Sequence, residues 1–276
     1  MDRSIIAAIA WHELVVTIRS RWLGIFALAF GALALAISYF GLVTGGMVGF
    51  QGFSRTSASV LNLVLYLIPL VALMMGTLSF TSEKSAGELL FSQPVTRTEI
   101  LVGKLLGLFL SLVAATLLGF GSAGLVIALK TSGEGAERYP LVVGLALVLE
   151  LVFLCLAVLT ATLCQRKSKA IGVALFLWFF FVIFYDLLVI GGTFLLKERT
   201  ANLFVFLSLF GNPVDMIRVA SLIALDGEEI FGVAGAALIR FVGGSGALIA
   251  LMTALLVVWI AAPIIAADRL LRRQDI

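Results

Sequence analysis

The chain has 276 residues, of which 62% are apolar and 13% charged, and its formal net charge is +3. Soluble domains contain roughly 25% charged residues, so this composition excludes a soluble globular domain and predicts an all-α, polytopic membrane protein. The basic residues lie in groups of no more than three, which argues against a nucleic-acid-binding surface.

Residues 1–22 are predicted to form an amphipathic interface helix ahead of the first membrane span. Trp11, Val15, Ile18 and Trp22 fall on one stripe at helical spacing. Charged and hydroxyl side chains lie opposite this stripe: Asp2, Arg3, Glu13, Thr17 and Arg21. Such a helix lies on the inner surface of the lipid bilayer with its tryptophans at the level of the headgroups.

Six apolar runs are long enough to cross a membrane. A helix needs about 20 predominantly apolar residues to cross a hydrocarbon core of about 30 Å. The runs cover residues 23–43, 58–80, 105–129, 141–163, 170–195 and 247–266. We therefore predict a single six-helix transmembrane domain over residues 23–276.

The basic residues divide unevenly between the two sides of this domain. Twelve of the 19 lysines and arginines lie in the two termini, in residues 81–104 and in the 164–169 loop, and the other seven lie in the remaining segments. Because cationic loops stay in the cytoplasm, both termini are predicted to be cytoplasmic.

The polar stretch between the second and third spans carries two helix-start patterns. Ser85 to Glu88 and Thr96 to Glu99 both match the capping box, in which a hydroxyl and a carboxylate satisfy free backbone N–H groups. Pro94 between them ends the first helix. The pattern predicts a short helix over about 85–93, after which the third span begins at Thr96.

The short helix has an apolar face that the cytoplasm would leave uncovered. Ala86, Leu89 and Leu90 follow helical spacing, and Phe91 is next to them. These side chains have neither lipid nor core to bury against on the cytoplasmic side, so we expect a partner protein to hold the helix in a groove.

Two carboxylates lie at membrane depth, Glu150 in the fourth run and Asp186 in the fifth. An ionised group there costs about 2.5 to 3.5 kcal/mol, so both should face the protein interior or a wet cavity. They either line a translocation path and bind a cation or proton, or are hydrogen-bonded groups that fix helix packing. The sequence leaves both alternatives open.

The connection over about 196–246 is predicted to be an external helical segment between the fifth and sixth spans. Residues 203–210 form an apolar run too short to span a membrane. A helix start follows, with Asn212 as N-cap, Pro213 at the first helical position and Asp215 in the first turn. Arg218 lies one turn further along.

Familiar catalytic and nucleotide-binding motifs are missing from the sequence. It contains no HExxH or CxxC pattern, so we predict neither an enzyme nor a metal site. It also contains no GxxxxGK[ST] phosphate-binding motif, so any ATP must bind to another protein. Gly119 to Gly124 match GxGxxG but lie inside an apolar run with no preceding strand. They are interpreted as a small-residue face that lets helices approach closely.

The motifs RSRW at residues 19–22 and SEKSAGELLFSQPVTRTEILVGK at residues 82–104 resemble the permease subunits of ABC-2 type transporters. This resemblance implies a six-helix, type V exporter-like permease fold. The short helix would then be the coupling helix, held by a separate ATPase that binds ATP and Mg²⁺. The coupling residues carried over by the motif are Glu83, Lys84, Gly87, Glu88, Leu89, Leu90, Phe91, Pro94 and Arg97.

A narrower resemblance runs along almost the whole chain. GFGSAGLVIAL, FLWFFFVIFYDLLV, FGNPVDMIRV and DRLLRR are similar to permeases of the nitrous-oxide reductase maturation system. That family, in the bacterial inner membrane, pairs two permease copies with two ATPases and a periplasmic β-helical protein, and serves assembly of the reductase's copper–sulfur site.

The resemblance leaves several mechanisms open. The chain would move a copper or sulfur species, or would transmit ATPase motion to the periplasmic partner without moving a solute. In the second case the segment starting with Asn212, Pro213, Asp215 and Arg218 would dock that partner. The alternative function is a generic ABC-2 efflux permease for a drug, ion or lipid-like substrate.

Overall fold

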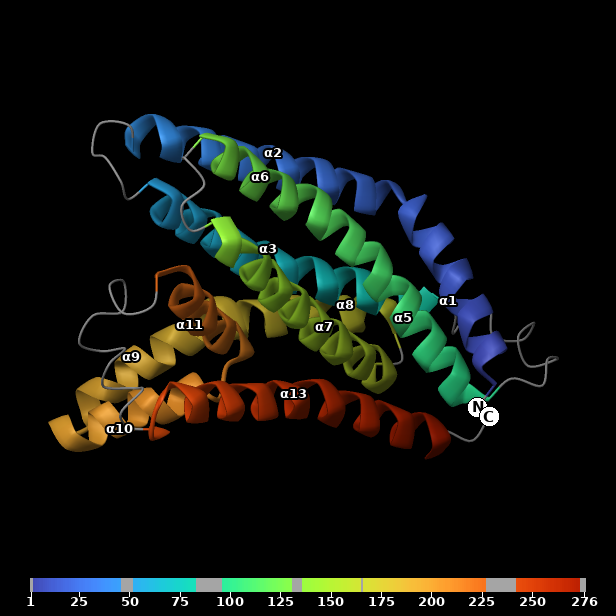
Figure 1. Ribbon diagram of the computed structural model, residues 1–276. Coiled ribbons are helices and arrows are strands. Elements are labelled where there is room, and N and C mark those ends of the chain that lie inside the picture. The colour runs from blue at the N-terminus through green and yellow to red at the C-terminus, as the bar shows by residue number, and fades with distance from the viewer. Residues whose placement is uncertain are drawn as a thin grey trace.

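The computed structural model describes residues 2–45, 52–82, 96–130, 136–164, 166–226 and 242–273. Every regular element in these ranges is a helix, and the helices pack into one elongated bundle (Figure 1). This confirms the predicted all-α class.

The N-terminal helix ends earlier than predicted. α1 (Arg3–Ile18) stops before Arg19, and α2 (Arg21–Gly45) starts at an angle of 64° to it. Asp2 caps α1 by accepting from the Ser4 hydroxyl and amide, and these bonds lower its pKa. Trp11 and Ile18 of the predicted stripe are exposed on α1, Val15 is half-buried, and Trp22 is exposed on α2, so a membrane-surface position of this segment stays a prediction.

The remaining long helices coincide with the other predicted spans. They are α3 (Gly52–Ser82), α5 (Arg97–Thr116) continuing through η2 (Leu117–Gly121) into α6 (Ser122–Lys130), α7 (Tyr139–Leu163), α8 (Lys167–Phe179) continuing through η4 (Phe180–Phe184) into α9 (Tyr185–Leu195), and α13 (Ser245–Arg273). Five of the described helices are long and apolar enough to cross a membrane, or up to seven if each bent pair is one span. The count of six therefore stays a prediction.

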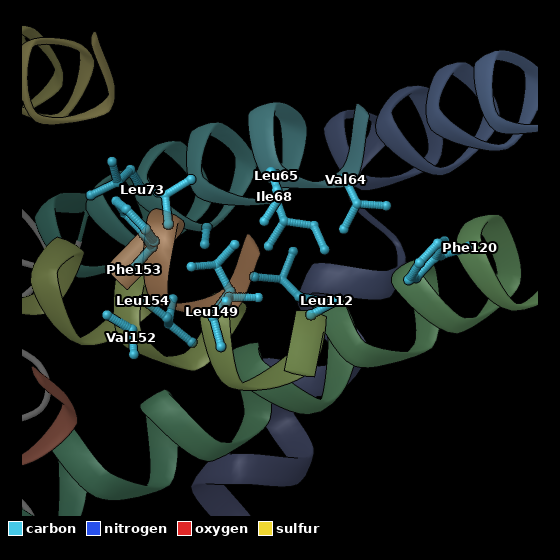
Figure 2. Close-up of a cluster of buried hydrophobic side chains, with 14 of the residues drawn as sticks. Val64, Leu65, Ile68, Leu73, Leu112, Phe120, Leu149, Val152, Phe153 and Leu154 are labelled. Atoms are coloured by element: carbon cyan, nitrogen blue, oxygen red, sulfur yellow. The ribbon is translucent and has the colours of Figure 1, made fainter. Parts of the chain in front are cut away.

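α7 forms the centre of the bundle. Its most apolar window is 67% buried, whereas the corresponding window of α8–α9 is 17% buried. α7 packs against α3, α13 and α11 (Pro213–Asp226). Figure 2 shows Leu149 and Phe153 of α7 meeting Leu65 and Leu73 of α3 in this core. The poorly buried α8–α9 face is left for lipid or another chain.

Glycines allow α1 to lie directly against α5. A Cβ added at Gly103 would lie 2.9 Å from the Cβ of Ile9, and one added at Gly107 would collide with the carbonyl of Ala10. The two glycines lie one turn apart on α5, so they form a smooth strip that admits the α1 backbone.

The GxGxxG stretch also serves packing, as the sequence indicated. Gly119 faces the ring of Phe30 in α2, and Gly124 faces the ring of Tyr139 at the start of α7. A Cβ on Gly31 of α2 would lie 3.9 Å from the Cα of Gly119, so the two backbones approach closely.

The connection between α9 and α13 contains two described helices. α10 (Glu198–Leu209) covers the predicted short apolar run, and α11 follows it after a bend of 96°. The Asn212 side chain accepts from the amide of Val214 at 3.0 Å, which confirms Asn212 as the N-cap of α11. Residues 227–241 of the predicted external segment lie outside the described residues.

Candidate functional site

The predicted coupling residues lie almost entirely outside the described residues. This applies to Glu83, Lys84, Gly87, Glu88, Leu89, Leu90, Phe91 and Pro94. The structure does describe both flanks, since α3 ends at Ser82 and α5 begins at Arg97. The flanks show how the segment joins the bundle.

A capping box organises the start of α5. The Thr96 hydroxyl accepts from the Glu99 amide at 3.3 Å, and the Glu99 carboxylate accepts from the Thr96 amide at 3.0 Å, as predicted. The same carboxylate accepts from the Asp2 amide at 2.6 Å. Glu99 therefore joins the first residues of α1 to the first turn of α5.

The C-terminal helix holds the same turn from another side. The Arg97 guanidinium donates to the carbonyl of Leu271, and the Thr98 hydroxyl donates to Asp268 at 2.8 Å. Arg272 donates to Asp268 at 2.8 Å and to the Thr98 hydroxyl at 3.2 Å. Three consecutive residues after the coupling segment are thus bound to α13 or to the start of α1. Both chain ends consequently meet at one end of the bundle (Figure 1).

A buried ionic cluster ties α1, α3 and α5 together close to this end. Ser79 donates from its hydroxyl to Glu13 at 2.6 Å, and Lys104 Nζ donates to the Ser79 carbonyl at 2.9 Å. Lys104 Nζ lies 3.9 Å from the Glu13 carboxylate, and the two side chains are only 4% and 10% exposed, respectively. The cluster fixes the end of α3 to the beginning of α5, on either side of residues 83–95.

Glu150 lies deep in the bundle, near the middle of α7. It is 2% exposed, and one carboxylate oxygen accepts from the Thr116 hydroxyl at 2.6 Å. The other oxygen, Oε1, is buried with no hydrogen-bond partner among the described residues. Buried polar atoms are normally paired, so this oxygen is available to take up a proton or to bind a ligand group.

Asp186 occupies a different environment, because it joins the residues expected to dock a partner. Arg218 Nη1 lies 2.6 Å from Asp215 and 3.4 Å from Asp186, whose side chain is 40% exposed. The Arg218 charge is shared by two carboxylates and is held more tightly by Asp215. Asp186 therefore links α9 to α11, whereas Glu150 is bonded to α5, and the two carboxylates make no direct contact with each other.

Asn212 and Pro213 are buried, so neither presents its side chain on the surface of the chain. Asn212 Nδ2 donates to the Phe181 carbonyl at 2.9 Å and to Asp215 at 2.8 Å. Tyr185 donates to the Ser208 carbonyl at 2.6 Å. These bonds fasten the α10–α11 corner to the adjoining membrane helix, and Asp215 and Arg218 are the half-buried residues at its edge.

The described residues include two π turns that the sequence did not indicate, η2 and η4. A π turn widens the helix and shifts its backbone hydrogen bonds by one residue, and such turns are frequent at functional sites. In each case another helix supplies a donor to a carbonyl of the turn: Tyr139 donates to Phe120 at 2.8 Å, and Asn212 donates to Phe181. Thr116 precedes η2 and Asp186 follows η4, so each membrane carboxylate is bonded at a π turn or lies beside one.

Comparison with known proteins decides the family. The profile of the ABC-2 family transporter proteins matches residues 7–276. The chain belongs to this family. Two relatives are named "Probable ABC transporter permease protein NosY". The one from Pseudomonas aeruginosa is 35% identical over 278 residues, covering 99% of both chains. The one from Stutzerimonas stutzeri is 35% identical over 228 residues, covering 80% of this chain and 82% of the relative.

Sequence reasoning missed the ionic cluster of this ABC-2 permease. Glu13 is predicted on the polar face of the N-terminal helix, and in the structure Glu13 and Thr17 of that face are buried, whereas Arg3 and Arg21 are exposed. One feature of the sequence did indicate this cluster. Lys104 is a single cation at the start of an apolar run, and a cation there needs an anionic partner. Asp268 and Arg272, spaced four residues apart on the last helix, were the corresponding signal for the contact with Thr98.

Proposed function

We propose that this ABC-2 permease is the membrane subunit of an ATP-driven transporter for maturation of the copper–sulfur site of nitrous-oxide reductase. The observation that carries the proposal is the near-full-length similarity to a relative named NosY. The four motifs that resemble reductase-maturation permeases lie within this matched length. The setting would be the bacterial inner membrane, with both termini cytoplasmic.

ATP hydrolysis would take place in a separate subunit. The chain carries no phosphate-binding motif, so two ATPase copies would hold ATP and Mg²⁺. Residues 85–93 would form the coupling helix that each ATPase holds. Its flanks support this role, because Lys104 and Ser79 fasten the two flanking helices to each other and Arg97 fastens α5 to α13. A push on the segment would move these helices together.

Two permease copies would assemble as a homodimer around the transport pathway. The aromatic surface of α8–α9 is available for the second copy, since Phe176, Phe179 and Phe184 are all more than 40% exposed. Glu150, with its unpaired buried oxygen, is the candidate path residue. Asp186 would either line the transport pathway as well or serve only to hold α9 to α11.

The second mechanism, transmission to a periplasmic β-helical protein without solute movement, rests on a specific observation. Asn212 and Arg218 connect α11 directly to η4 and α9, so motion of that membrane helix reaches the external segment. Docking would use the half-buried Asp215 and Arg218, while Asn212 and Pro213 shape the helix start from inside.

Genetic complementation tests the proposed function. The chain is expressed in a denitrifying bacterium that lacks its own reductase-maturation permease, and the copper content and visible spectrum of purified nitrous-oxide reductase are measured. We expect the copper–sulfur site to return. A reductase that stays without this site, although the permease reaches the membrane and binds the host ATPase, would contradict the proposal and favour the generic efflux function.

A further inference from the structure

The corner between α1 and α2 carries an exposed surface that the proposed function does not use. Trp11 and Trp22 are 68% and 69% exposed, and Ile18 between them is also exposed. Beyond the bend, Ile25 and Leu28 of α2 are also exposed. Large exposed apolar side chains are costly in water, so the corner must be covered.

Positive charge accompanies this apolar surface. Arg19 and Arg21 flank Ser20 at the 64° bend, and both are exposed. Neither guanidinium has a hydrogen bond or ion pair within the part of the chain that the structure describes. The two arginines lie immediately before the apolar run of α2. Residues at that position of a membrane helix lie at the depth of the lipid headgroups.

Among the described residues, no acidic side chain forms an ion pair with these arginines. Glu13 is the one carboxylate between Arg3 and Ser82 in the sequence, and it is turned inward to Ser79 and Lys104. The corner therefore carries two exposed tryptophans and two exposed arginines that have no ion pair among the described residues. Tryptophan favours the membrane interface, and arginine pairs well with phosphate, so the surface is complementary to an anionic phospholipid.

We propose that the α1–α2 corner, defined by Trp11, Ile18, Arg19, Arg21 and Trp22, is a binding site for anionic phospholipid headgroups. The apolar side chains enter the acyl boundary while the two guanidiniums hold the phosphate. Because α1 also contacts α5 through Gly103 and Gly107, bound lipid fixes the position of the helix next to the predicted coupling segment. Lipid rather than a protein is the proposed occupant, because the exposed tryptophans and arginines lie directly before the long apolar run of α2.

Tryptophan quenching by brominated lipid tests the proposal on the full chain in vesicles. The chain has four tryptophans, and replacing Trp178 and Trp259 with phenylalanine leaves only Trp11 and Trp22 as reporters. Brominated phosphatidylglycerol is compared with brominated phosphatidylcholine at equal mole fraction. Each arginine adds about fivefold to the preference for anionic lipid at low salt, and the preference falls as salt is raised.

The variants decide the outcome. R19Q/R21Q removes the preference, R19K/R21K keeps most of it, and K197Q, which changes an exposed lysine at the start of α10, leaves it unchanged. If R19Q/R21Q does not insert, R19Q and R21Q singly each lose part of the preference. Equal quenching by both lipids in the parent chain, or a preference that survives R19Q/R21Q, overturns the proposal. Absence of quenching by either lipid does so too, because something other than lipid then covers the tryptophans.

Discussion

Replacing Glu13 with alanine removes the acceptor of the Ser79 hydroxyl and the anion beside Lys104. The Lys104 side chain is only 4% exposed, so the charge cannot recover its hydration without local opening. Breaking a buried ion pair from one side costs about 3 to 5 kcal/mol. The Lys104 bond to the Ser79 carbonyl at 2.9 Å remains and offsets part of this loss, so we expect the lower end of that range.

The natural cysteines provide the assay. Cys155 and Cys164 are both buried, so a thiol-reactive fluorescent dye reports their exposure as the chain unfolds in detergent on heating. On the scale known for soluble domains of similar size, the loss corresponds to a melting temperature lower by roughly 10 °C. The matched control is E137Q, which alters an exposed carboxylate and should leave the melting temperature unchanged.

A double variant separates the ion pair from simple loss of packing. In E13Q/K104M both charges are gone and the methionine keeps most of the lysine volume, so most of the stability should return. E13A melting at the parent temperature would refute the argument. So would an E13Q/K104M loss equal to the sum of the losses of E13Q and K104M measured singly, because the two charges would then be independent.

Three further predictions follow from the helix contacts. G107V forces α1 away from α5 and should make the N-terminal helix sensitive to limited proteolysis, whereas G144V, at a glycine with open space around it, should not. N212A leaves the Phe181 carbonyl without its donor and removes the cap of α11, so thiol-dye melting should fall by several degrees, and an unchanged curve would contradict the capping role. D186N should lower transport or coupled ATPase turnover in the reconstituted complex; unchanged rates would exclude a functional role for Asp186.

Local features of the fold could be predicted from the sequence because neighbouring residues decide them. Thr96 and Glu99 cap α5 together, and Asn212 with Pro213 starts α11, through bonds that span only two or three positions. The apolar stripe with Trp11 was predictable for the same reason, since helical spacing alone places it.

The remainder depended on residues far apart in the chain. Glu13 is bonded to Ser79, and Arg97 is bonded to a carbonyl 174 positions away. No spacing rule gives the partner of a single charge over such distances. The π turns could not be predicted for a different reason. Their sequences are as apolar as that of an ordinary span. The side chains that donate to their carbonyls, Tyr139 and Asn212, come from other parts of the chain.

We propose that a separate ATPase binds the coupling helix at residues 85–93, and co-purification of the two proteins tests this. The tagged permease is expressed with its ATPase, and the ATPase retained after membrane extraction is measured for the parent chain and for L89D/L90D. We predict that the parent retains the ATPase and that L89D/L90D loses it. The control L195D/L196D, in an exposed leucine pair at the end of α9, should retain it. An ATPase that stays bound to L89D/L90D would contradict the account.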